Sequence, residues 1–330
     1  GLVDDYDRHL ADHSYQGEGE TGRGATKRVP MWDSTPAPVP LDAYIDAWHG
    51  AEAARWIDAY DRDAPFFLFV GFPGPHDPWD APAAAVENVD ADSVPMPAST
   101  RRPDVTAANG AYGRMLKAFL HLSDTDTMTD DAIRGMRRAY VAALGIIDDG
   151  VGRIVDALAA TGRLDDTWIL YTSDHGEMGG DHGLMSKCVF YEPSMRVPLV
   201  VRPPGGGAGR VDDTLVEQID IATTIRAIAG AGPVDRSDGQ SLLEPDRPVR
   251  TVSVTENWGF AAFATDRYKL VVDEDALLPC QLFDLHADPA EDHDLVADPG
   301  HKAVVDELME THVRPFFATP PQRPHPGPFT

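Results

Sequence analysis

The 330-residue sequence carries 54 acidic and 28 basic side chains, a formal net charge of −26. A field of this sign disfavours nucleic acid and anionic membranes as partners, and no apolar run approaches the ~18 residues of a membrane span. The length exceeds the size at which one core stops growing, so we expect one large domain and a smaller one.

The first 39 residues are rich in Gly, Asp, Arg and Pro and show no sustained period, which predicts mostly loop. We expect no signal peptide at the start of the chain. The compartment is left open, and a periplasmic or secreted location is compatible with the sequence. From Leu41 to Tyr60, apolar residues recur at helical spacing after Asp42. This pattern predicts an amphipathic helix capped by Asp42.

The apolar run Phe66 to Phe72 is typical of a buried strand, and Pro73-Gly74-Pro75-His76-Asp77-Pro78 follows it. Prolines on both sides of His76 restrict the backbone, so the imidazole is held at the end of this strand. Histidine can donate a hydrogen bond to an oxyanion or protonate a leaving oxygen near neutral pH. We therefore predict that His76 is catalytic, while Asp77 either orients the imidazole or caps the turn.

The clearest helix of the sequence runs from Asp130 to Thr161, where apolar residues keep a 3.6-residue rhythm and Gly162 follows the end. It joins the run at 66–72 to the β-rich run at 168–172. A helix between two strands predicts a crossover unit and hence a parallel sheet. Val197–Val201 is predicted to add a strand, and 219–229 to add a helix.

The strand predicted at 168–172 is followed directly by the polar segment Ser173-Asp174-His175-Gly176. In parallel α/β sheets, ligands collect at these carboxyl ends of the strands. Asp174 and His175 offer a hard oxygen and an imidazole side by side, a combination that suits a divalent metal. Lys187, further along the same segment, could supply a positive charge to an anion bound on that metal.

The texture of the sequence changes after about residue 245. Short alternating runs from Val249 to Asp284 predict a small antiparallel sheet, 301–313 predicts a closing helix, and Pro320–Thr330 is predicted to be extended. We therefore divide the chain into an α/β domain at 1–245 and a carboxy-terminal α+β subdomain at 246–330. Cys188 and Cys280 offer one disulfide at most.

Three motifs together resemble the sulfatase family of the alkaline phosphatase superfamily. These are S-D-H-G-E at 173, G-D-H-G-L-x-x-K ending at Lys187, and R-V-P-L-V-V-R at 196, and P-H-D-P around His76 matches a further family motif. The resemblance implies that Asp174 and His175 bind the metal, most often Ca²⁺ with Mg²⁺ or Mn²⁺ as alternatives, and that Lys187 and His76 contact the sulfate. It also implies an alkaline phosphatase-like α/β fold, a mostly parallel sheet flanked by helices.

The family nucleophile is a formylglycine made within a C/S-x-P-x-R motif near the amino terminus, and this sequence holds no such motif. We therefore expect the chain to be an inactive fragment truncated at the amino terminus. An exposed sheet edge would then favour oligomers. The function implied for the intact protein is metal-assisted hydrolysis of a small-molecule or carbohydrate sulfate ester.

Two other functions remain open at this point. A phosphonate monoester or phosphodiester hydrolase of the same superfamily fits the same D-H-G motif followed by lysine. A noncatalytic anion-binding scaffold, from a different class of protein, would retain the fold without the chemistry. The identity of the upstream nucleophile and the preferred ester would distinguish a phosphonate or phosphodiester hydrolase from a sulfatase. Absence of metal binding in a titration would favour the noncatalytic scaffold.

Overall fold

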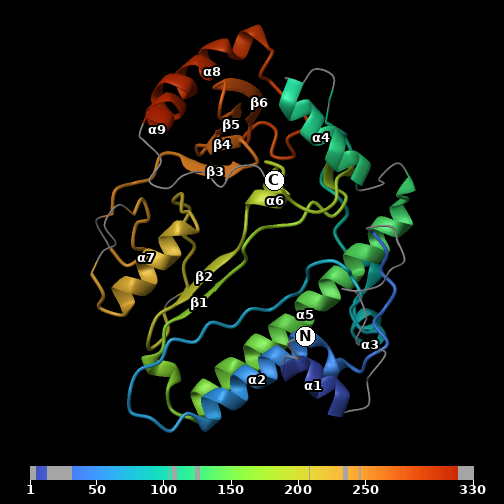
Figure 1. Ribbon diagram of the computed structural model, residues 1–330, viewed down its shortest axis with the longest axis vertical. Coiled ribbons are helices and arrows are strands. Elements are labelled where there is room, and N and C mark those ends of the chain that lie inside the picture. Colours follow the sequence, from blue (N-terminus) through green and yellow to red (C-terminus); the bar gives the residue numbers. More distant parts are fainter. Residues whose placement is uncertain are drawn as a thin grey trace. The chain divides into compact units, whose positions relative to one another are not determined.

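The computed structural model describes residues 5–12, 32–103, 105, 110–122, 127–207, 209–232, 237–244 and 247–318. The protein is an α/β chain, as predicted (Figure 1), and it groups into two compact units. Unit 1 comprises Gly1–Pro97, Ser123–Ile169 and Arg202–Gly207, and unit 2 comprises Ala98–Leu122, Leu170–Val201 and Ala208–Thr330. The boundary expected at residue 245 stays a prediction, and the tail 320–330 lies outside the described residues.

In unit 1, helices α2 (Ile45–Ala59) and α5 (Asp130–Ala160) lie side by side (Figure 1). Helix α5 confirms the prediction from periodicity, and the Thr129 hydroxyl caps it by accepting a hydrogen bond from the Ala132 amide at 3.2 Å. The two helices approach closely at Gly50 and Gly150, because a Cβ added to Gly50 would lie 2.5 Å from the Gly150 Cα. Glycine at both positions permits this contact. The short helix α3 (Ala83–Glu87) belongs to the same unit.

The amino-terminal region, predicted to be mostly loop, contains one helix among its described residues, and the cap predicted at Asp42 is wrong. Residues Asp5–Asp12 form helix α1 rather than loop, and the Tyr6 hydroxyl donates to the Ala43 carbonyl at 2.9 Å. This helix depends on tertiary contacts, which an eight-residue segment cannot reveal by its period. Asp42 lies inside a short 3₁₀ helix, and α2 begins after Tyr44 without a side-chain cap.

The strand predicted at Phe66–Phe72 is not formed within the described residues. Phe66 and Leu68 pack against the Ile57 cluster, whereas Phe67 and Phe69 are 70% and 82% exposed. The segment therefore alternates as a strand would, but a strand also requires a hydrogen-bonded neighbour. No described strand pairs with it.

Unit 2 contains the predicted strands β1 (Ile169–Thr172) and β2 (Leu199–Arg202), which pair with each other and reach into unit 1 by one residue each. The Thr172 hydroxyl donates to the Pro198 carbonyl at 2.9 Å beside this pair. Helices α4 (Gly110–Leu122), α6 (Glu192–Met195) and α7 (Ile219–Ile228) belong to the same unit. The helix expected at 219–229 is thus confirmed.

The predicted carboxy-terminal antiparallel sheet is present in the order β3 (Ser253–Asn257), β4 (Phe260–Ala264), β5 (Tyr268–Asp273) and β6 (Leu278–Asp284). Phe260, Ala262 and Val271 face one core, and Ala261, Phe263 and Leu270 face another. Helix α8 (Lys302–Leu308) and the π-helix Met309–Val313 cover the second face, and α9 (Arg314–Ala318) follows them.

Residues from the connection between β1 and β2 cover the first face of this sheet. Met178, Leu184 and Phe190 share a cluster with Phe260 and Ala262. Both cysteines are free thiols and contact the same cluster. The first face of the sheet therefore packs against the β1–β2 connection, which carries Lys187.

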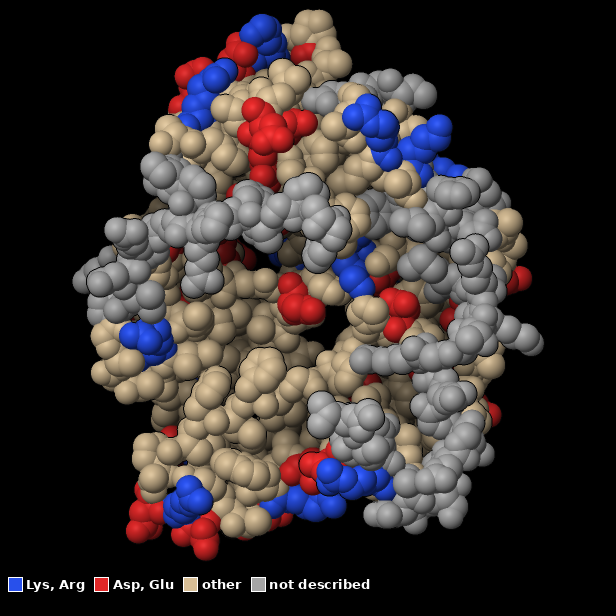
Figure 2. Space-filling model, viewed as in Figure 1, with Lys and Arg blue, Asp and Glu red and all other residues tan. Residues whose placement is uncertain are grey.

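Surface charges are mixed in sign on the face that Figure 2 shows, where small groups of basic side chains lie beside acidic ones. Several described pairs are close in sequence, such as Lys302 with Asp306 and Arg314 with Glu310. Exposed pairs of this kind contribute little to stability. Among the described residues, no helix has the length and apolar character needed to cross a bilayer.

The ion pair between Arg267 and Asp284 predicts a specific response to acid. The guanidinium donates to Asp284 Oδ2 at 2.8 Å, and this pairing lowers the Asp284 pKa from 3.8 to about 2. Because the folded state binds this proton less readily than the unfolded state, the stabilisation is present above about pH 4 and is lost toward pH 2. In Asp284→Asn, we expect the urea midpoint to fall less steeply between pH 4 and pH 2 than in the wild type. Asp275→Asn, an exposed turn position, is the control, and parallel curves for Asp284→Asn and wild type would contradict the assignment.

Candidate metal and anion site

Side-chain donors hold the backbone carbonyls of the loop after β1. The side-chain amide of Gln218 donates to the carbonyls of Ser173 at 2.7 Å and Asp174 at 2.6 Å, and the Ser173 hydroxyl donates to the His175 carbonyl at 2.9 Å. Gln218 lies just before α7, so this helix positions the loop. With the carbonyls engaged, the Asp174 carboxylate projects outward and is 84% exposed.

The side chains of Asp174 and His175 lie together, as predicted. His175 Nε2 is 3.5 Å from Asp174 Oδ2, while Asp174 Oδ1 accepts the His175 amide at 2.9 Å. His175 Nδ1 is 2.8 Å from the Gly176 carbonyl, which can only accept, so Nδ1 carries the proton. In the neutral ring, Nε2 therefore presents its lone pair on the side of the carboxylate.

Gly176 brings this loop into contact with α6. Its amide donates to the Ser194 carbonyl at 2.8 Å, and the Glu177 amide donates to the Pro193 carbonyl at 2.9 Å. A Cβ at Gly176 would lie 1.9 Å from the Pro193 carbonyl oxygen, a distance no real Cβ adopts. Glycine is therefore required at this position.

Lys187 is half-buried and follows a closed loop. The Met178 amide donates to the Ser186 carbonyl at 2.8 Å, which closes residues 178–186. Ser186 and Cys188, on either side of the lysine, have φ values of 69° and 75°. Non-glycine residues in this region cost free energy and persist only where the surroundings impose them. The Asn257 amide donates to the Cys188 carbonyl at 3.0 Å and so ties this backbone to β3.

The donor set of Asp174 and His175 fits part of a metal site. A carboxylate oxygen and an imidazole nitrogen 3.5 Å apart can act as adjacent ligands of one ion. Ca²⁺ takes six to eight ligands and Mg²⁺ takes six, however. Within the part of the chain that the structure describes, no group of three His, Cys, Asp or Glu side chains is placed to hold an ion.

His76 lies in unit 1, on the loop that follows the extended segment at 66–72. Its Nδ1 is 2.8 Å from the Asp77 carbonyl and 3.1 Å from Asp77 Oδ1, so Asp77 orients the ring. Asp46 of α2, fully buried, accepts the Gly74 amide at 2.9 Å and anchors this loop. The His76 side chain is 44% exposed.

Asp174, His175 and Lys187 all belong to unit 2, and His76 belongs to unit 1. Sequence reasoning offered Asp77 as a residue that orients His76, but it missed two residues that hold the other loops. Gln218 and Asn257 carry no local motif, because each contacts a loop more than 40 residues away. Gly176, in the D-H-G pattern, and Asp77, in P-H-D-P, each gave a local signal.

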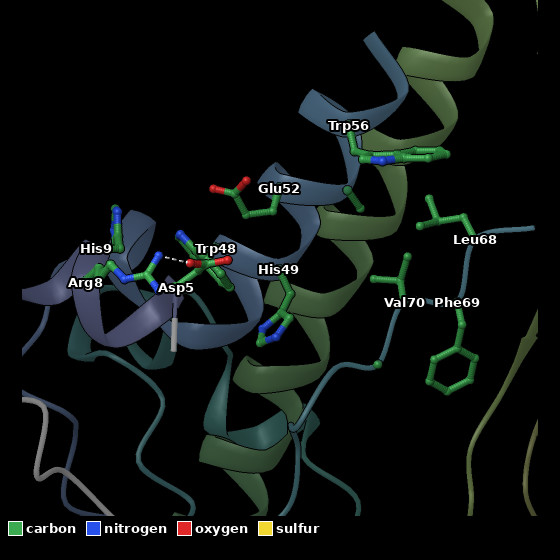
Figure 3. A pocket seen from close by; sticks show the side chains of 12 residues that line it. Asp5, Arg8, His9, Trp48, His49, Glu52, Trp56, Leu68, Phe69 and Val70 are labelled. Atoms are coloured by element: carbon green, nitrogen blue, oxygen red, sulfur yellow. Dashed lines mark hydrogen bonds and ion pairs between the residues drawn. The ribbon is translucent and has the colours of Figure 1, made fainter. Parts of the chain in front are cut away.

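A hollow of about 620 Å³ in unit 1 is a separate feature (Figure 3). Trp48, His49 and Trp56 of α2 line it together with His9 of α1 and Phe69 of the extended segment. Its lining therefore combines aromatic rings and imidazoles with charged and aliphatic side chains. None of the four predicted site residues is among the residues that line it.

Comparison with known proteins gives consistent similarities. The family model described as Sulfatase matches residues 11–231. A multifunctional alkaline phosphatase superfamily protein, PehA of Trinickia caryophylli, is 30% identical over 86% of this chain and 61% of its own length. A choline-sulfatase of Rhizobium meliloti (strain 1021) is 32% identical over 77% of this chain and 50% of its own length.

Among solved structures, the phosphonate monoester hydrolase of Agrobacterium radiobacter has a TM-score of 0.76 and 27% identity. The match covers 94% of this chain and 69% of that one. This agreement confirms the predicted fold. The chain spans only 50% to 61% of the length of the two relatives above.

The Gly176 contact predicts a sharp effect of a single methyl group. Gly176→Ala would drive Cβ into the Pro193 carbonyl, so we expect a loss of about 1–3 kcal/mol in the free energy of unfolding. Gly232→Ala, in the same unit with open space around it, is the matched control and should change stability by less than about 0.5 kcal/mol. Equal urea midpoints for the two variants would contradict the close approach.

Proposed function

The chain belongs to the sulfatase family, and from this premise we propose that it carries the metal-binding and anion-binding residues of a sulfuric ester hydrolase. The observation that carries the proposal is the pairing of Asp174 Oδ2 with His175 Nε2 at the end of β1, with Lys187 in the same unit. The substrate class is a small-molecule or carbohydrate sulfate ester.

In this proposal, Asp174 and His175 contribute two ligands to a divalent cation, Ca²⁺ first and Mg²⁺ or Mn²⁺ as alternatives. When bound, such an ion neutralises charge on the ester oxygens. The Nδ1 proton of His175 is held by the Gly176 carbonyl, which supports Nε2 as the ligating atom. Gln218 binds the backbone carbonyl of Asp174 at 2.6 Å and so limits the movement of the loop that carries the carboxylate.

Lys187 supplies a positive point charge to a sulfate oxygen. Its backbone is fixed on both sides by left-handed residues and by the Asn257 contact. An ammonium beside the sulfate oxygens would stabilise the charge that develops on them in the transition state. The role of Lys187 is therefore electrostatic.

His76 donates a proton or a hydrogen bond to the leaving oxygen through Nε2. The Asp77 carboxylate and carbonyl, 3.1 Å and 2.8 Å from Nδ1, orient the ring so that Nε2 is the nitrogen available for this donation. The sequence holds no C/S-x-P-x-R motif, so we assign no nucleophile to its residues. The 330-residue chain by itself should therefore bind cation and anion without turnover.

One observation favours a second candidate function. The TM-score of 0.76 belongs to a phosphonate monoester hydrolase, and the 30% identical relative is named as multifunctional. The same residues could bind a phosphonate monoester, because the tetrahedral anion presents similar oxygens. Rates for p-nitrophenyl sulfate and p-nitrophenyl phenylphosphonate, measured side by side on the complete protein, decide between the two.

Divalent-cation binding tests the first role. We expect Asp174→Ala and His175→Ala each to weaken Mn²⁺ binding to the chain by at least about tenfold in isothermal titration, since each removes one ligand. Asp275→Asn removes an exposed carboxylate of the same unit and should leave the affinity unchanged. Equal affinities in all three variants would reject the metal assignment.

Turnover tests the other two roles. In the complete protein, Lys187→Ala and His76→Ala should each lower kcat by about 10²-fold or more, because each removes a group used in the transition state. Lys302→Ala and His293→Ala, at surface positions of unit 2, are the matched controls. Wild-type kcat in Lys187→Ala would eliminate the electrostatic role.

A further inference from the structure

Lys269 of β5 is fully buried, which is rare for lysine unless it is paired. Tyr268 and Leu270 face the core under α8, whereas Val271 faces the other side of the sheet. Alternation along the strand therefore directs Lys269 to the face that the β1–β2 connection covers. Its ammonium lies beneath that connection.

Two carboxylates meet this ammonium. Lys269 Nζ lies 2.9 Å from Glu192 Oε1 and 2.5 Å from Glu291 Oε1. Glu291 is 2% exposed and has a left-handed φ of 58°. Burial raises the Glu291 pKa, and the lysine opposes this rise. The cation thus compensates a buried carboxylate that would otherwise be costly.

Glu291 also binds the first residue of α6. Its Oε2 accepts the Glu192 amide at 2.7 Å. Glu192 is therefore held twice, by its carboxylate on Lys269 and by its backbone on Glu291. The start of α6 is fixed to the sheet through these two contacts.

The two residues that follow Glu192 in α6 bind the loop that carries the proposed metal ligands. The Pro193 and Ser194 carbonyls accept the Glu177 and Gly176 amides, and the Gly176 carbonyl accepts the His175 ring proton. A continuous series of contacts therefore runs from Lys269 through Glu192 and α6 to the His175 imidazole. Each link joins described residues of unit 2.

We propose that Lys269, with Glu192 and Glu291, is a positioning residue that sets α6 and thereby the Asp174–His175 pair for cation binding. This inference rests on the proposed function, because the cation is part of it. A buried ion pair often adds little net stability over apolar residues of similar volume, so the triad can be neutralised with limited loss of folding. The effect of the triad on the position of the Asp174–His175 pair can then be measured separately from its effect on the stability of the fold.

The test uses the double variant Lys269→Met/Glu291→Gln, which keeps side-chain volume and an acceptor for the Glu192 amide. We expect Mn²⁺ binding at least about tenfold weaker than in the wild type, together with faster hydrogen exchange at the Gly176 and Glu177 amides. The urea midpoint reports whether the fold persists. If the double variant does not fold, Glu291→Gln alone carries the test, with the same changes expected at about threefold or more.

Arg267→Gln is the matched control, because it breaks an ion pair of the same sheet that does not contact α6. It should leave Mn²⁺ binding and exchange at both amides unchanged. A folded double variant with wild-type affinity and wild-type exchange overturns the positioning role. If the wild type itself binds no Mn²⁺, the metal assignment fails, while the exchange rates still decide whether the triad positions the loop.

Discussion

The contact between Gly176 and α6 is the constraint on which the candidate site depends. Two consecutive amides bind two consecutive carbonyls, at a separation that no side chain other than hydrogen permits. The connection from β1 to β2 has little regular structure of its own. Backbone-to-backbone contacts of this kind therefore replace the rigidity that a longer helix or strand would supply.

The antiparallel sheet has a corresponding role in packing. Its first face is covered by the β1–β2 connection, so Met178 and Phe190 of that connection share one core with Phe260. Polar contacts also join the sheet to this connection, since Asn257 binds the Cys188 carbonyl and Lys269 binds Glu192. The carboxy-terminal strands are thus part of what fixes the site. Apolar burial supplies the stability, and the polar contacts determine the geometry.

Sequence patterns predicted the features that repeat locally. The 3.6-residue period gave α5, the short apolar runs gave β1 and β2, and D-H-G located the Asp174–His175 pair at a strand end. The run at 66–72 shows the limit, because hydrophobic alternation cannot report whether a neighbouring strand is present. The Lys269 triad was also not predictable, since its members lie far apart in sequence. Its only local signal is a lysine among the apolar residues of Tyr268–Val272.

The two predicted histidines share one arrangement although they lie in different units. In each, Nδ1 faces a carbonyl of the following residue, Asp77 for His76 and Gly176 for His175. A carbonyl can only accept, so the local backbone fixes which nitrogen carries the proton. In both rings, Nε2 is therefore the nitrogen left for the roles proposed above. The neighbouring carboxylates lie differently: Asp77 Oδ1 is 3.1 Å from Nδ1 of His76, whereas Asp174 Oδ2 is 3.5 Å from Nε2 of His175. One type of backbone contact thus orients both imidazoles for the two roles proposed for them.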